Sequence, residues 1–142
     1  MALASVAIRT TNLTITQASA EIRTTAAVKA RLLEISVVQA TATAQSLGFG
    51  RPAAIGVTPG TISTFQRDDS ADPACVTTQN ASWATSPTAP TVYHRRWNSA
   101  ATIGVGFVMT YPRGIIIPVS ASFVVFNITA AVANDLSVAI DE

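Results

Sequence analysis

Apolar side chains recur at every second position along much of this chain, and that rhythm limits the folds it can adopt. The stretch 103–111 places Ile, Val, Phe, Met and Tyr at alternate positions, and the stretch 135–141 does the same with Leu, Val and Ile. A period of two gives a strand one apolar and one polar face, whereas an amphipathic helix needs a period of about 3.6 residues. The pattern therefore predicts antiparallel strands and little or no helix.

Turn-forming residues separate these runs at the spacing that is typical of a sandwich or barrel. We therefore predict an all-β fold, an antiparallel β-sandwich, as a single domain over residues 1–142. A jelly roll is favoured because long loops must carry the chain between the two sheets, with an immunoglobulin-like sandwich as the alternative. The turn signals lie at 48–52, 58–60, 68–73, 87–90 and 112–114.

Four segments carry more specific expectations. Residues 19–30 mix helix-forming Ala and Lys with strand-forming Ile and Thr, so we predict strand, turn and strand, with a short helix as the alternative. Residues 1–16 are expected to form an N-terminal arm or an edge strand. The Ile run at 115–117 predicts a strand that is covered on both faces. The polar stretch 67–89 is expected to be an exposed loop.

The chain carries unusually little charge. Only 12% of its residues are charged and its net charge is +1, against about 25% charged residues in an average soluble domain. Such a surface lacks the repulsion that keeps proteins apart, and subunit interfaces are more apolar than free surface. We therefore predict a homo-oligomer or an assembly subunit; a sticky monomer is the alternative.

Several partner classes have no support in the sequence. The only tight basic pair is Arg95–Arg96, which is too little for binding to a nucleic-acid backbone. No stretch approaches the ~18 uncharged apolar residues of a membrane helix. The start of the sequence does not resemble a signal peptide, so we expect the protein to remain in the cytoplasm or in particles that assemble there.

The residues that could support catalysis or bind a metal ion are sparse. His94 is the only histidine, and the adjacent arginines should lower its pKa. Cys75 is the only cysteine, which excludes an intrachain disulfide, and we expect it to pack as a small hydrophobic residue. Glu21 and Glu34 lie in alternating stretches and are expected to face solvent. Asp68, Asp69 and Asp72 could hold a calcium ion, but their spacing is not that of an EF-hand, so a solvated loop is favoured. We predict neither enzymatic activity nor a cofactor.

Three groups of residues are candidates for a protein interface. The segment 93–97 is rich in Tyr, Arg and Trp, which are over-represented in interface hot spots; alternatively, its aromatic side chains face the core and its arginines face water. Two glycines would allow another backbone to approach closely, either within the sheet or from a subunit. Apolar residues of the N-terminal stretch could pair with a neighbouring chain. These candidates are Tyr93, Arg95, Arg96, Trp97, Gly104, Gly106, Leu3, Val6 and Ile8.

The segments 20–24, 31–35, 50–59 and 112–118, together with the ending Asp141-Glu142, resemble small structural virion proteins of tailed bacteriophages. The resemblance implies a jelly-roll sandwich that decorates or cements the capsid, most often as a trimer. It implies binding to the major capsid protein on the capsid surface of the virion. A tail, neck or head-fibre component is the nearest alternative, and a carbohydrate-binding β-sandwich module is another.

Overall fold

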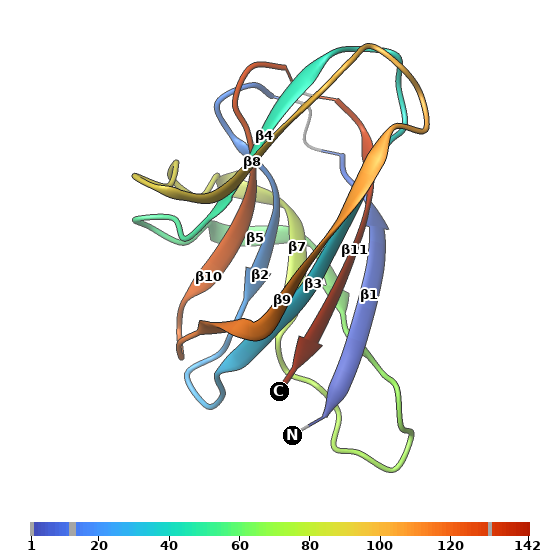
Figure 1. Ribbon diagram of the computed structural model, residues 1–142. Coiled ribbons are helices and arrows are strands. Elements are labelled where there is room, and N and C mark those ends of the chain that lie inside the picture. Colours follow the sequence, from blue (N-terminus) through green and yellow to red (C-terminus); the bar gives the residue numbers. More distant parts are fainter. Residues whose placement is uncertain (1, 12–13, 131) are drawn as a thin grey trace.

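The computed structural model describes residues 2–11, 14–130 and 132–142, and the strands in these residues form two antiparallel sheets that pack face to face (Figure 1). No helix occurs in the described residues. The strands are β1 (Leu3–Arg9), β2 (Ala18–Arg23), β3 (Ala30–Gln39), β4 (Gln45–Gly50), β5 (Val57–Thr64), β6 (Gln66–Arg67), β7 (Thr78–Thr85), β8 (Tyr93–Ser99), β9 (Gly106–Ile117), β10 (Ser122–Asn127) and β11 (Asn134–Asp141). The predicted all-β sandwich is confirmed.

The order of the strands is that of a jelly roll. One sheet has the order β6-β1-β11-β3-β9, and the other has the order β5-β7-β2-β10-β4-β8. The antiparallel pairs β1–β11, β2–β10, β3–β9 and β4–β8 are nested inside one another along the chain. The chain therefore behaves as one long hairpin, rolled so that successive pairs lie in opposite sheets. β5, β6 and β7 are additions between β4 and β8.

The main core fills the space between the two sheets. Phe49 and Phe123 are fully buried there, and the ring of Phe107 meets Phe49 edge-on at 5.6 Å between centroids. Most of the apolar rows that the sequence predicts face this core: Met109 comes from β9, and Leu136 from β11. Ile103, which starts the predicted row 103–111, is an exception, because it precedes β9 and is 65% exposed. Alternation along each strand thus turns the apolar side chains inward and leaves the other row outside.

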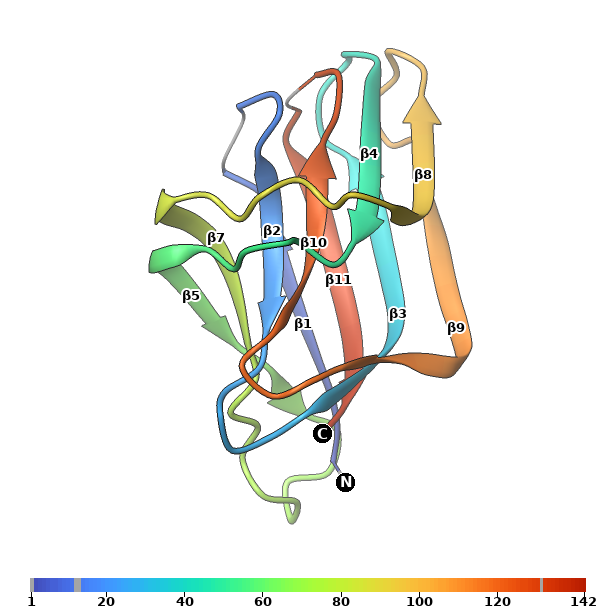
Figure 2. The same ribbon diagram turned by 90° about the vertical axis from the view of Figure 1, so that its left-hand side faces the viewer.

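A second apolar layer covers the outer face of the sheet that contains β10. The connections 51–56 and 86–92 cross this face side by side (Figure 2), and two hydrogen bonds between Ala54 and Thr88, of 2.8 and 3.1 Å, join them. Beneath and beside them, Val124 and Phe126 are buried against Trp83. β10 is therefore buried along its whole length.

Glu21 lies beneath the same layer and is fully buried, so the prediction that it faces solvent is wrong. Its carboxylate accepts hydrogen bonds from Trp83 Nε1 (2.7 Å), Asn80 Nδ2 (3.2 Å) and the backbone N–H of Gly56 (3.1 Å). The position alternates as the sequence suggests, but connections that are distant in sequence cover the outer face of β2. Glu21 thereby ties β2 to β7 and to the connection before β5.

The structure confirms one of the segment predictions and corrects others. Residues 19–30 form strand, turn and strand, as predicted. The run 115–117 is not covered on both faces, because Ile116 is 38% exposed on the outer face of the sheet while Ile117 is fully buried. Within 67–89, β7 occupies Thr78–Thr85 and pairs with β2 and β5, so only residues 68–77 and 86–89 lie in loops.

Two of the predicted turns lie inside strands. Residues 112–114 belong to β9, where they bulge between the pairs Thr110–Glu34 and Ile115–Leu32. Gly114 has φ +65° there, and a Cβ atom at this position would overlap the side chain of Arg31. Residues 58–60 belong to β5, whose register with β7 shifts at this point. Pro and Gly mark bulges as well as turns.

Replacing Glu21 by Gln is expected to lower the free energy of unfolding by about 1–3 kcal/mol, because an amide NH₂ would take the place of one acceptor oxygen among three buried donors. Urea unfolding followed by circular dichroism measures the difference. Glu34→Gln, at a partly exposed position of β3, is the matched control and should change stability by less than about 0.5 kcal/mol. Equal stabilities of the two variants would contradict the bonding described for Glu21.

Candidate functional site

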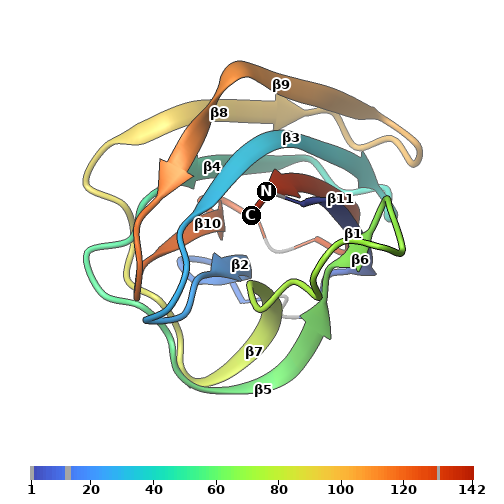
Figure 3. The same ribbon diagram turned by 90° about the horizontal axis from the view of Figure 1, so that it is seen from below.

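The outer face of the sheet β1-β11-β3-β9 is bare, in contrast to the covered face of the other sheet (Figure 3). The strand registers align its outward side chains in four rows across the sheet. All of these side chains are exposed or partly exposed. The rows are Arg9–Asp135–Val38–Gly106, Ala7–Ser137–Ser36–Val108, Ser5–Ala139–Glu34–Thr110 and Leu3–Asp141–Arg31–Ile116. We call this surface the bare face.

Ala and Ser occupy most of the two central rows of the bare face, with Glu34 among them, and large aliphatic side chains stand toward its borders. Leu3 is 51% exposed and Val108 is 60% exposed. At one corner Arg9 donates two hydrogen bonds of 2.7 Å to the carboxylate of Asp135. This ion pair raises the pKa of Arg9 and lowers that of Asp135. The face therefore combines exposed apolar side chains with charges of both signs, as protein interfaces do.

A groove opens on the flank where the two sheets end in β8 and β9. It has a volume of about 400 Å³, with Trp97, Phe107 and Met109 among its lining residues and Arg95 and Arg96 beside them. The rings of Trp97 and Phe107 lie 4.8 Å apart. Both strands are the outermost of their sheets, so this flank also presents free strand edges. We call it the β8–β9 groove.

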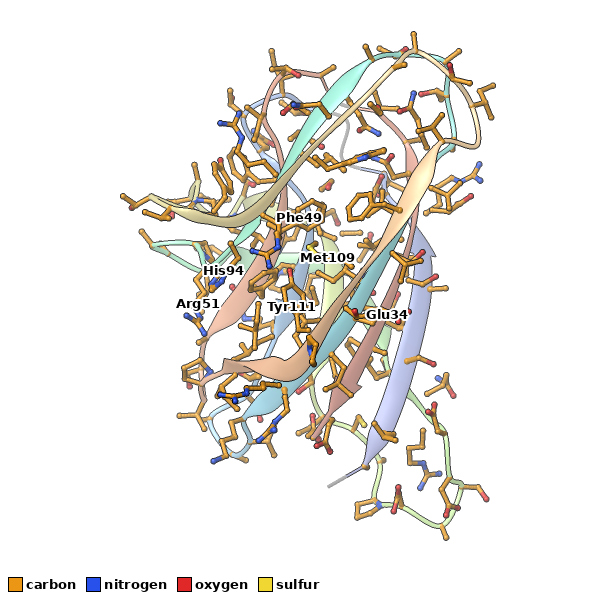
Figure 4. The ribbon with its side chains drawn as sticks, in the orientation of Figure 1. Glu34, Phe49, Arg51, His94, Met109 and Tyr111 are labelled. Carbon is orange, nitrogen blue, oxygen red and sulfur yellow. The ribbon has the colours of Figure 1, made fainter. Side chains whose placement is uncertain are left out.

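A small cluster of polar side chains lies next to this groove. Figure 4 shows Arg51 and His94 side by side, with Tyr111 reaching toward them from β9. The His94 ring packs 5.6 Å from Phe123. The pKa of His94 is lowered mainly by partial burial of the ring. The nearby positive charges of Arg51 and Arg95 lower it further. The hydroxyl of Tyr111 donates to Met109 Sδ at 3.1 Å. The imidazole therefore carries no charge at neutral pH.

The segment 93–97 has the arrangement of the second of its two sequence interpretations, with packed aromatic side chains and arginines that face water. Trp97 packs against the main core and Tyr93 against the covered outer layer. Arg95 and Arg96 are exposed, and the guanidinium carbon of Arg96 lies 5.8 Å from the centre of the Tyr93 ring. The aromatic residues are thus structural, and the arginines are available to a partner.

The two glycines have different roles. Gly106 faces the backbone of β3, and a Cβ atom at this position would lie 2.3 Å from the Val37 carbonyl oxygen. Its small size therefore serves pairing within the sheet. Gly104 precedes β9 with φ +82° and has open space around its Cβ position, so it serves the turn.

The N-terminal candidates lie in a strand of the sheet and not in a free arm. β1 pairs with β11 along its whole length, and with β6 at Ala4 and Ser5. Leu3 points outward on the bare face, whereas Val6 and Ile8 are partly buried against the core. Within the predicted arm 1–16, residues 1, 12 and 13 lie outside the described residues.

The described residues offer little for catalysis. No three His, Cys, Asp or Glu side chains among them are arranged to hold a metal ion. Cys75 packs against the core, as predicted. Partial burial is the main cause that raises the pKa of its thiol, and the negative charge of Glu142 raises it further. Nor do the described residues include a helix that is long and apolar enough to cross a membrane.

Comparisons with known proteins leave the family of the chain open. No protein-family model matches the sequence, and neither a curated protein nor a solved structure matches it significantly.

The sequence interpretation overlooked the most distinctive surface. The sequence interpretation used the apolar row of each alternating strand, which faces the core. The bare face consists of the outward rows of the same strands, with Ala7, Ser36 and Ser137 in a central row. A signal was present, because Leu3, Val38 and Val108 stand at outward positions where a solvent-facing strand normally has polar residues. Arg51 was also overlooked as a neighbour of His94.

We expect the pKa of His94 to lie below its usual value of 6.5. Replacing Arg51 by Gln should raise it, since a neighbouring cation that disfavours the imidazolium is removed. A pH titration of the imidazole ring protons by NMR measures this directly, because the chain has one histidine. Lys29→Gln serves as the control and should leave the value unchanged. A wild-type pKa at or above 6.5 would contradict the environment described.

Proposed function

We propose that this chain is a structural protein of a tailed-phage virion, which decorates the capsid with its bare face against the major capsid protein. The observation that carries the proposal is the bare face itself, an uncovered sheet surface on which four large hydrophobic residues are exposed: Leu3, Val38, Val108 and Ile116. Exposed apolar side chains gathered on one face mark sites of contact with other proteins. The face also carries charges of both signs, which an opposing protein surface can match.

The dimensions of the bare face also favour an oligomer. Four strands at ~4.8 Å spacing, each about seven residues long at ~3.4 Å per residue, give an area of roughly 450 Å². Stable one-to-one complexes bury about 800 Å² on each partner. One copy would therefore bind weakly, whereas several linked copies would bind together with much higher avidity. The proposal thus includes a homo-oligomer, for which a trimer is the state that the sequence resemblance implies.

The carbohydrate-binding alternative has less support. Jelly rolls occur in lectins as well as in viral capsids, so the fold does not decide between these functions. Sugar binding uses aromatic rings with a free face, but Trp97 lies 4.8 Å from Phe107 and packs against the core. A position on the tail or neck keeps the same chemistry and differs only in the virion protein that is bound.

Adding charge to the bare face should weaken capsid binding. The double variant Ala7→Lys/Ser36→Lys places two ammonium groups in one row of this face, and we expect at least about a tenfold loss of affinity. Co-sedimentation of the protein with purified phage heads measures the effect. Thr64→Lys, at an exposed position of β5, is the control and should bind as the wild type does. Unchanged binding of the double variant would exclude the bare face as the docking surface.

The position in the particle needs a separate test. An antibody against the chain, visualised by gold labelling of particles from the phage whose genome encodes it, should mark the capsid surface. Labelling confined to the tail or neck would replace the capsid by that site, and unlabelled particles would contradict a role in the virion.

A further inference from the structure

Unpaired charges of opposite sign lie on two separate parts of this molecule. Arg95 and Arg96 lie in β8, and Arg51 lies beside its first residues. All three arginines are exposed. Within the described residues, ion pairs join only Arg9 to Asp135 and Arg23 to Glu21. None of these three arginines therefore has a carboxylate partner in the part of the chain that the structure describes, and the lining of the β8–β9 groove beside Arg95 and Arg96 includes Trp97, Phe107 and Met109.

The complementary surface is the loop 68–76, which we call the acidic loop. Asp68 and Asp69 are exposed and Asp72 is partly exposed, and none of them takes part in an ion pair within the described residues. Small and apolar residues accompany the carboxylates, and Val76 is 44% exposed. An acidic loop with apolar side chains matches a groove with an apolar base and basic borders.

Hydrogen bonds hold the acidic loop in a defined shape. At its start, the backbone N–H of Asp68 donates to the Leu3 carbonyl oxygen at 2.9 Å. At its end, the N–H groups of Val76 and Thr77 donate to the Glu142 carboxylate at 2.9 and 2.8 Å. Within it, the Asp69 carboxylate accepts the N–H of Ala71 at 2.8 Å. A loop fixed in this way loses little conformational entropy when it binds.

The acidic loop cannot occupy the groove of its own chain. It lies at the end of the sandwich where the termini are, whereas β8 lies toward the other end (Figures 1 and 2). A contact between the two surfaces must therefore join different copies. Because it uses two different patches, it is heterologous, and repetition of such a contact closes into a ring when the rotation between copies allows it.

We propose that the acidic loop of one copy docks into the β8–β9 groove of the next, with Asp68 and Asp72 facing Arg95 and Arg96. This contact rests on the proposed function, since it is the link that makes several bare faces act together on the capsid. Val108 and Thr110 belong to both surfaces, so the docked loop covers the β9 border of the bare face and leaves its positions on β1, β11 and β3 free for the capsid protein.

Charge reversal tests the contact. Asp68→Lys/Asp72→Lys reverses the loop, Arg95→Glu/Arg96→Glu reverses the groove, and sedimentation velocity measures self-association of each variant. Each reversal alone should weaken it by at least about tenfold, and a mixture of the two variants should associate again, because both loops then meet grooves of opposite charge. Lys29→Glu/Arg113→Glu makes the same change of charge at exposed positions outside the loop, the groove and the bare face, and this variant should associate as the wild type does. Self-association of the wild type should also weaken between about 0.05 M and about 0.5 M salt.

A covalent test does not depend on charge. In a Cys75→Ser background, cysteines at Ser70 in the loop and Thr110 in the groove should form disulfides between copies on mild oxidation, while Ser70→Cys with Thr64→Cys should not. A wild-type chain that stays monomeric, or that associates without these cross-links and without sensitivity to the reversals, overturns the contact. Capsid binding by such a monomer would leave the decoration role standing and refute the homo-oligomer, whereas association without capsid binding would sustain the contact and refute the decoration role.

Discussion

The antiparallel pairing of β1 with β11 is the contact on which the rest of the molecule depends. It brings the two ends of the described chain together, with Ala2 and Glu142 joined by backbone hydrogen bonds of 2.7 and 3.1 Å. Its register decides which row of side chains faces the core. A shift of β1 by one residue against β11 would turn Val6 outward and bury Ser5 and Ala7. The bare face and the Glu142 anchor of the acidic loop both follow from this register.

The two sheets have different surroundings, and this difference divides their roles. On one sheet, the connections 51–56 and 86–92 form an extra layer that Glu21 holds to β2 and β7. That layer removes a large surface from contact with partners and makes β10 the most enclosed strand. On the other sheet nothing in the described residues covers the outer rows, so partner binding is assigned to the bare face, the free strand edges and the loop at the end.

The sequence was informative wherever burial follows from local alternation. The row 103–111 located β9, and 19–30 gave β2, a turn and β3, because the neighbours of these residues are in the same two sheets. The exposure of Glu21 and Ile116 was predicted wrongly because it depends on segments far away in the chain. Glu21 is covered by a connection that no local pattern reveals, whereas no segment of the described chain covers Ile116 on the outer face of its sheet. The residues of the bare face carried a readable signal in their outward aliphatic side chains, but the sequence alone did not reveal which rows would become neighbours.

The central claim is that the bare face is covered in the particle. Hydroxyl-radical footprinting of the free chain and of assembled particles tests it, since oxidation reports the accessibility of each side chain. Leu3, Val38 and Val108 on the bare face should lose most of their reactivity in the particle. Ile62 and Val92, which are 55% and 77% exposed elsewhere, serve as the reference. Equal oxidation of Leu3, Val38 and Val108 in both states would contradict the account.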